Sequence, residues 1–430
     1  MTSQPDRSPS KPGFGWTLLR TAFGLAIDSI FSHKLRSSLT LLGVIIGVAS
    51  VVLVGSAIEG MGAYADTTTS RVFGSNSFVI QRVAGAGMTR SEFLEKMRVN
   101  KRIRLEELAY LRATTGDQIQ YSPYMNRVED VKRLQGLQPA TFEGAVILGT
   151  SAELANIRDI ALTEGRYFTE QEERNRQAVA VIGQDVRNEL FPAGTPINQT
   201  ISIKGYDFRV IGLQEKLGSA GAQSQDNSIY IPATVFVKIF PRPDSIAIFG
   251  SPRPESDLSM NDALDAARAA LRSRFHTKPG KDDNFGSITP ESVRAFVDQL
   301  LALVAAVVVP ITAISLVVGG IVIMNIMLVS VTERTREIGI RKAVGARPSD
   351  IRLQFLVEAA ILAAVGGLIG LGLGAAAATV LGIVFATPLP VTLPYAVLAI
   401  VVSSIVGVIS GWYPAMRASK LDPIAALRAE

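Results

Sequence analysis

The side chains best placed to act together lie in one short charged segment, residues 333–351, between two long apolar runs. Its charged residues are Arg334, Arg336, Arg341, Lys342 and Arg347 against Glu333, Glu337 and Asp350. A basic loop beside apolar runs is typical of the cytoplasmic side of a membrane. Glu337 and Arg341 are four residues apart with the acid first, which favours a helix, and Gly345 is placed to end it. The segment is predicted to be either a solvated topogenic loop or a short helix that docks onto a separate protein.

One acidic residue, Glu358, lies inside the third apolar run, close to this basic segment. An acid within a membrane span is a candidate functional residue by default. Because Glu358 is less than two helical turns from Arg352, an interfacial ion pair is an equally good interpretation. No second acid or histidine is expected to accompany it in the membrane, which argues against a proton relay.

No other part of the sequence has the spacing of a catalytic or metal site. There is no cysteine, and the two histidines, His33 and His276, are far apart. The phosphate-binding pattern G-x-x-x-x-G-K-[ST] does not occur, since the Gly280-Lys281 pair is followed by Asp282. We therefore expect a chain that is not an enzyme and holds no metal and no cofactor. Any ATP and Mg²⁺ would be bound by a partner ATPase, for which the basic segment is the natural docking point.

The elements that must position this segment are four apolar runs, each near the ~20 residues that a spanning helix needs. The sequence predicts spans at residues 39–59, 290–331, 353–385 and 395–413, with a basic loop at 332–352. The region 290–331 is long enough to include a stalk outside the lipid, because 42 helical residues extend about 63 Å against a ~30 Å hydrocarbon core. Pro310 is expected to kink this helix.

The distribution of Lys and Arg predicts the orientation. Basic residues before the first span, in the loop 332–352 and in the tail 414–430 place both termini and that loop in the cytoplasm. Residues 1–15 are Pro/Ser-rich and expected to be disordered, and 16–38 have the periodicity of an amphipathic interfacial helix. The region 60–289 is then predicted to lie outside the membrane.

The region 60–289 has the pattern of an α/β domain. Helices are predicted at residues 105–114 and 261–275, and strands at 77–82, 142–149, 178–182, 200–204, 208–213 and 228–231. A hairpin turn is predicted at Gly205-Tyr206-Asp207. Without a nucleophile elbow or a paired-carboxylate site, this domain is expected to bind or to act as a spacer rather than to hydrolyse. The predicted fold class is thus a membrane α-helical protein of four transmembrane helices with an α/β extracytoplasmic domain between helices 1 and 2.

Small residues predict close helix packing within the membrane. Gly43 and Gly47 form a G-x-x-x-G pattern, which lets a second helix approach and here suggests a homodimer contact. Gly366, Gly367 and Gly370 give the third span a similar small-residue surface.

Four blocks of sequence in the same order resemble the permeases of the MacB/FtsX superfamily of ABC transporters. The blocks are KLRSSLTLLGVIIGVASVV from residue 34, LTEGRYFTEQE through the segment that ends at residue 213, RTREIGIRKAVGA with FLVEA from 334 to 359, and YPAMRASKLDPIAALR from 413. The resemblance implies a homodimer and a pair of ATPase subunits at the cytoplasmic face. It also implies that ATP hydrolysis moves the outer domains (mechanotransmission) in the bacterial inner membrane. It assigns ATPase contacts to Glu333, Arg334, Arg336, Glu337, Ile338, Arg341 and Lys342.

In the fused members of this family the ATPase precedes the first span, whereas about 38 residues precede it here, so a separate ATPase is expected. The favoured function is export of a small molecule, peptide or lipid-like substrate with a periplasmic adaptor, and possibly an outer-membrane channel, but no nucleic acid. Alternatives are lipoprotein release, activation of an extracytoplasmic cell-wall hydrolase without cargo, and an anchored binding protein with no ATPase.

Overall fold

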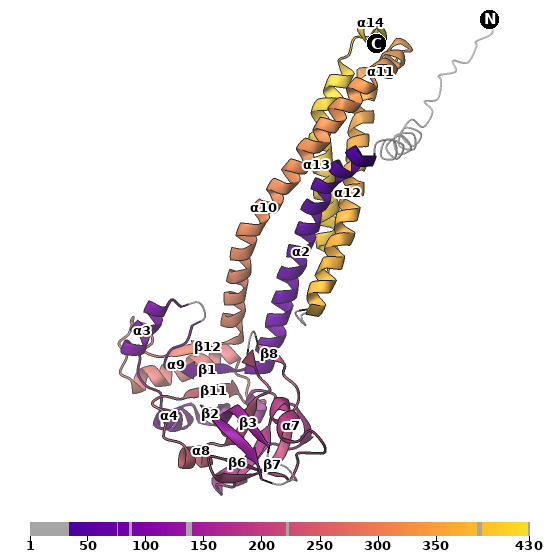
Figure 1. Ribbon diagram of the computed structural model, residues 1–430. Coiled ribbons are helices and arrows are strands. Elements are labelled where there is room, and N and C mark those ends of the chain that lie inside the picture. Colours follow the sequence, from indigo (N-terminus) through magenta and orange to yellow (C-terminus); the bar gives the residue numbers. More distant parts are fainter. Residues whose placement is uncertain are drawn as a thin grey trace, which may run out of the picture. The chain divides into compact units, whose positions relative to one another are not determined.

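The computed structural model describes residues 34–74, 76–85, 88–134, 140–220, 223–384 and 389–428 (Figure 1). The predicted disordered N-terminus, 1–15, and most of the predicted interfacial helix lie outside these residues. The chain divides into two units. The helical unit comprises Met1–Tyr64 with Leu300–Glu430, and the inserted unit comprises Ala65–Gln299.

Four long apolar helices confirm the four predicted spans. They are α2 (Lys34–Phe73), α10 (Pro290–Glu333), α12 (Pro348–Val384) and α13 (Leu393–Ser419), and each is long and apolar enough to cross a membrane. Two short helices follow α10 and α13, namely α11 (Thr335–Ala343) and α14 (Pro423–Arg428). Helix α2 continues 14 residues beyond the predicted end of the first span, since its polar last turns belong to the inserted unit. Helix α10 continues without a break through Pro310.

Glycines bring the helices of the helical unit into close contact. A Cβ atom built on Gly43 would lie 2.7 Å from the Cα of Gly319 in α10, and one on Gly47 would lie 2.8 Å from the Leu316 side chain. The G-x-x-x-G pattern therefore packs α2 against α10 within one chain. Its assignment to a homodimer contact was wrong, because the same surface of α2 is already covered by α10.

The third span uses its glycines in the same way. Gly366 and Gly370 face α2, where a Cβ on Gly370 would meet the carbonyl oxygen of Ile45 at 2.8 Å. Gly367 faces Ser403 of α13 instead. Buried apolar side chains from all four helices complete this core, and in Figure 1 the helices run side by side. These small residues allow backbones to approach where lipid supplies no hydrophobic drive for association.

The inserted unit is an α/β domain built on a ten-stranded sheet with the order β12-β1-β11-β2-β3-β10-β5-β7-β4, where β6 pairs with both β2 and β7. The strands are β1 (Phe78–Gln81), β2 (Ile119–Arg133), β3 (Thr141–Thr150), β4 (Leu162–Gly165), β5 (Val179–Ile182), β6 (Thr200–Ile203), β7 (Tyr206–Gln214), β10 (Ser228–Pro232), β11 (Ala247–Pro252) and β12 (Gly286–Ile288). A separate small hairpin joins β8 (Ser219–Ala220) and β9 (Gln223–Ser224). Because β6 pairs with β2 and β7, the pairings β2-β3-β10-β5-β7-β6-β2 close on themselves.

Helices cover both faces of this sheet. The helices of this unit are α3 (Arg90–Val99), α4 (Leu105–Thr115), α5 (Leu154–Ile157), α6 (Glu170–Arg174), α7 (Gln184–Leu190), α8 (Ala233–Ile239) and α9 (Met260–Arg274), with a 3-10 turn at Gly116–Gln118, and α3 alone among them buries no residue. Alternation along the strands sends neighbouring side chains to opposite faces. Ile147 and Ile248 join a core that includes α4, α8 and α9, whereas Leu148 and Phe249 join a second core that includes α5.

Two local predictions need correction. The β6–β7 turn consists of Lys204 and Gly205, both at positive φ (52° and 81°), and Tyr206 already pairs with Ile203. The hairpin therefore turns one residue earlier than predicted. The longest strand, β2, was missed because Pro123 and Asn126 interrupt its apolar pattern, and it is sheet pairing on both sides that keeps this segment extended.

A bidentate ion pair within the inserted unit makes its stability depend on pH. The guanidinium of Arg166 donates to both carboxylate oxygens of Glu172 at 2.7 Å, and this lowers the pKa of Glu172 to about 2. The depressed pKa stabilises the fold above pH ~4.5, and that stabilisation is lost as the pH falls from ~4.5 towards 2. Because the Arg166 side chain is half-exposed, we expect a contribution of about 1–2 kcal/mol.

We predict that Glu172→Gln lowers the free energy of unfolding at pH 7 by this amount and removes the loss between pH 4.5 and 2. The matched control is Glu170→Gln, which breaks only the exposed Glu170–Arg174 pair. Urea unfolding of the detergent-solubilised chain, followed by circular dichroism, measures the free energy of unfolding of each variant at pH 7 and across the range from pH 4.5 to 2. Equal pH dependence in the Glu172→Gln variant and the unaltered chain would contradict the assignment.

Candidate functional site

Helix α11 is the charged segment that the sequence singled out, and it forms as predicted. Glu337 and Arg341 pair along it at 3.9 Å. The helix ends where Gly345 adopts a φ of +106°, and the amide groups of Gly345 and Ala346 donate to the carbonyl oxygens of Lys342 and Arg341. Gly345 is required at this position because a side chain would strain the left-handed conformation.

The first attachment of α11 is a buried ion pair. Arg334 immediately precedes the helix, and its guanidinium donates to the two carboxylate oxygens of Glu358 at 3.2 and 3.4 Å. Glu358 is only 2% exposed, so its charge has no access to solvent. The structure thus favours the ion-pair interpretation of Glu358, with Arg334 rather than Arg352 as its partner. Arg341 adds a hydrogen bond to Gln354 of the same helix, α12.

The second attachment joins α11 to the end of α13. The ammonium group of Lys342 donates to the carbonyl oxygens of Ser419 and Leu421, both at 2.6 Å. These carbonyl groups lie where α13 ends and lack intrahelical partners, and a cation at that point also interacts favourably with the helix dipole. The Lys342 side chain therefore holds α11 to the end of α13 within the chain.

The third attachment is a close contact with α14. A Cβ on Gly339 would lie 2.8 Å from the Cβ of Ala426, so only glycine allows α11 and α14 to touch here. Ile338 beside it is fully buried. Ile338 was predicted to contact a partner, but its burial places it in the core of the helical unit instead.

The remaining side of α11 faces solvent. We define the exposed face of α11 as Arg336, Glu337, Ile340, Ala343 and Val344, all of which are exposed. Ile340 is 49% and Val344 85% exposed. These two apolar residues were not predicted as contacts. Their spacing of four residues, on the side of the helix away from Ile338, could have identified them as a second apolar surface of α11.

The exposed face of α11 has the composition of a docking surface. Two exposed aliphatic side chains with a neighbouring arginine match the composition of protein interfaces, in which apolar anchors are surrounded by polar groups. Among the residues that the structure describes, no cluster of His, Cys, Asp and Glu could hold a metal ion. Glu333 is exposed and makes an interaction of its own.

Comparison with known proteins gives matches along nearly the whole chain. The family described as MacB-like periplasmic core domain matches residues 37–273, and the one described as FtsX-like permease C-terminal matches residues 309–423. The macrolide export ATP-binding/permease protein MacB of Bdellovibrio bacteriovorus is 34% identical over 94% of this chain. This chain spans 61% of that protein's length.

Two further comparisons are with a permease of similar length and with the solved structure of a periplasmic region. The uncharacterized ABC transporter permease YknZ of Bacillus subtilis is 30% identical over 94% of this chain and 98% of its own length. The crystal structure of the periplasmic region of MacB from Actinobacillus actinomycetemcomitans covers 53% of this chain at 17% identity, with a TM-score of 0.42.

Proposed function

This chain belongs to the family of ABC transporter permeases with a MacB-like periplasmic core domain and an FtsX-like C-terminal region, and from that premise we propose that it transmits mechanical work from a separate ATPase to its inserted unit. The ATPase binds and hydrolyses ATP with Mg²⁺, and the permease itself carries out no chemistry. The work drives export of a small molecule, a peptide or a lipid-like substrate.

The observation that carries this proposal is the way α11 is held. Three attachments, through Arg334, Gly339 and Lys342, join it to α12, α14 and the end of α13. A short helix fixed on three sides cannot yield locally when its exposed face is pushed. A force applied at Ile340 or Val344 is therefore passed to the spanning helices rather than dissipated in a loop.

Helix α10 supplies the route by which that movement leaves the docking site. It ends at Glu333, directly before Arg334, and it is one continuous helix of 44 residues. At ~1.5 Å per residue this corresponds to about 66 Å, roughly twice the hydrocarbon thickness. Its first residues, from Pro290 to Gln299, belong to the inserted unit. A continuous hydrogen-bonded helix is stiffer than a loop, so it suits a lever.

The proposal also gives the orientation of the chain in the membrane and its partner proteins. Both termini and α11 lie in the cytoplasm of a bacterial cell, the inserted unit lies outside the inner membrane, and two copies of the chain work with two ATPase subunits. A periplasmic adaptor, with an outer-membrane channel where the envelope has one, receives the substrate. The basic residues that flank the spans support this orientation.

We predict that the double variant Arg336→Glu/Val344→Asp loses the ATPase. Both residues lie on the exposed face of α11, and their side chains make no hydrogen bond or ion pair with the described part of the chain, so folding should be unaffected. Charge reversal and a polar group in an apolar contact should weaken binding by about 100-fold or more. The measurement is co-purification with the partner ATPase, together with the ATP hydrolysis that the permease stimulates.

The control for the charge reversal is Arg417→Glu, which alters an exposed arginine at the end of α13. This variant should retain the ATPase. Undiminished recruitment by the double variant would show that the ATPase does not dock on α11.

A further inference from the structure

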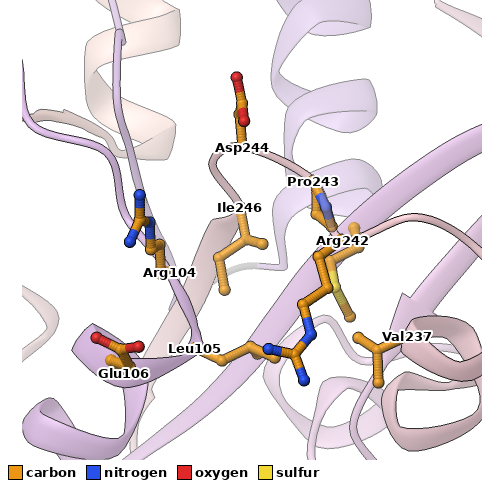
Figure 2. A pocket seen from close by; sticks show the side chains of 9 residues that line it. Arg104, Leu105, Glu106, Val237, Arg242, Pro243, Asp244 and Ile246 are labelled. Atoms are coloured by element: carbon orange, nitrogen blue, oxygen red, sulfur yellow. The ribbon is translucent and has the colours of Figure 1, made fainter.

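The inserted unit contains two neighbouring cavities that form one groove. Their volumes are about 450 and 430 Å³, and both are lined by Met125, Pro243 and Ile246. Volumes of this size are typical of small-molecule sites. The first cavity lies between the start of α4, the strand β2 and the loop after α8 (Figure 2). The second continues from the shared wall to α3.

One end of the groove is basic. Arg104 and Arg242 line the first cavity, and neither guanidinium pairs with a carboxylate in the described part of the chain. Asp244, which lines it as well, is paired with Arg102 at 3.7 Å. In Figure 2 the Arg242 guanidinium extends towards Leu105. The Asp244 carboxylate points in the opposite direction, away from the Arg242 guanidinium and from Leu105. Glu106 is then the one remaining acid against two arginines.

The segment that adjoins the basic end of the groove, residues 82–104, is also positively charged. Residues 82–104 contain seven Lys and Arg against two Glu, a net charge of +5 that equals the formal charge of the entire chain. A concentration of one sign around a cavity raises the local concentration of oppositely charged ligands. The basic end of the groove is therefore suited to an anion.

The other end of the groove is apolar and lies beside an unusual helix. Phe93 and Met97 of α3 line the second cavity, yet α3 has no buried residue. Phe93 and Leu94 are 45% and 51% exposed. The helix is held in place nonetheless, since Arg82 donates to the carbonyl oxygens of Met97 and Asn100, and the Asn100 side chain donates back to the Arg82 carbonyl at 2.7 Å. Polar bonds thus keep an apolar surface beside the cavity without covering it.

We propose that this groove binds an amphipathic anion, with its head group at Arg104 and Arg242 and its hydrocarbon chain against Phe93 and Met97. Guanidinium groups form strong, paired hydrogen bonds with phosphate and carboxylate. Each methylene group buried along the apolar end strengthens binding further. An amphipathic anion is thereby named as the substrate class. Only the statement that the bound molecule is the one exported rests on the proposed function.

The test uses the full chain in phosphatidylcholine nanodiscs, without ATPase, and a tryptophan placed in the groove. Both natural tryptophans, Trp16 and Trp412, lie outside the inserted unit and can be replaced by phenylalanine. Leu105→Trp then supplies one reporter at the wall of the first cavity. The probes are octyl phosphate, octyl glucoside, octyltrimethylammonium and inorganic phosphate, each below its micelle concentration.

We expect a saturable change in fluorescence with octyl phosphate and none with the neutral or cationic octyl compounds. Arg104→Gln/Arg242→Gln should raise the Kd about tenfold or more, and Met97→Asn should raise it by a smaller factor. Arg209→Gln, which changes an exposed arginine on β7, should leave it unaltered. Circular dichroism confirms that each variant is folded.

Three results would overturn the proposal. They are the absence of saturable octyl phosphate binding, equal binding of octyl glucoside or inorganic phosphate, and an unchanged Kd in the folded double arginine variant. Nanodiscs that contain phosphatidylglycerol distinguish a membrane lipid from a diffusing molecule, since a lipid source would change the fluorescence before any probe is added. Loss of ATPase docking on α11 would leave these binding results intact, so the two proposals fail separately.

Discussion

Replacement of Glu358 by alanine is expected to destabilise the helical unit by about 3 kcal/mol or more, because it leaves the Arg334 guanidinium partly buried without its counter-charge. Glu358 is almost completely buried, and Arg334 supplies its ion-pair contact. Removal of one member of a buried pair costs far more than removal of both, since the remaining charge keeps its full desolvation penalty. The same change should also release α11 from α12 and reduce stimulation of the ATPase.

The double variant Arg334→Met/Glu358→Met provides the decisive comparison. Two apolar side chains of similar length fill the same space and leave no unpaired charge, so most of the stability should return. A third variant, Glu337→Ala, removes only the exposed pair with Arg341 and should cost less than ~1 kcal/mol. Denaturation by SDS, followed through Trp412 fluorescence in a Trp16→Phe background, measures all three. A Glu358→Ala variant as stable as Glu337→Ala would show that the pair does not hold α11.

The second large effect concerns the contact between α12 and α2. A leucine at Gly370 must place its Cβ 2.8 Å from the Ile45 carbonyl oxygen and 2.9 Å from the Val48 Cβ. These are backbone and β-branched atoms that cannot rotate away, so the two helices must separate. We expect Gly370→Leu to lower the free energy of unfolding by about 3 kcal/mol, at the upper end of what overpacking costs.

The chain contains a closely matched control for this prediction. Gly372 lies two residues further along α12, and a Cβ built there meets nothing within 4 Å. Gly372→Leu adds the same side chain to the same helix, and it should leave stability within about 0.5 kcal/mol. The same SDS denaturation compares both variants. Similar losses in the two would show that the contact with α2 does not decide the result, since the gain in helix propensity from glycine to leucine is the same at both positions.

The positions of the four spanning helices could be predicted from the sequence because the signal is local. A run of about 20 apolar residues identifies a span whatever surrounds it, and α10 was predicted within two residues of its observed end at Glu333. The strands β5, β6, β7 and β10 were likewise predicted from short apolar runs. The strand β2 was not, because its extended conformation depends on partners from three separate segments, β3, β6 and β11.

The candidate site was predicted as a segment but not as an arrangement. Sequence alone established that α11 is a short basic helix, that Gly345 ends it and that Glu337 faces Arg341, since each depends on residues within one or two turns. It could not assign Arg334 to Glu358, or Lys342 to the carbonyl groups of Ser419 and Leu421, because those partners are 24, 77 and 79 residues away.

Which side of each helix is covered was decided only by the tertiary structure. Gly43 and Gly47 have the pattern of a helix contact, but nothing in the pattern says whether α10 of the same chain or a second copy supplies the other surface. The groove beside α3 depends in the same way on residues from β2, α3, α4 and the loop before β11. The physical reason is that spans, caps and turns arise from interactions between near neighbours, whereas burial and pairing depend on how distant segments pack together.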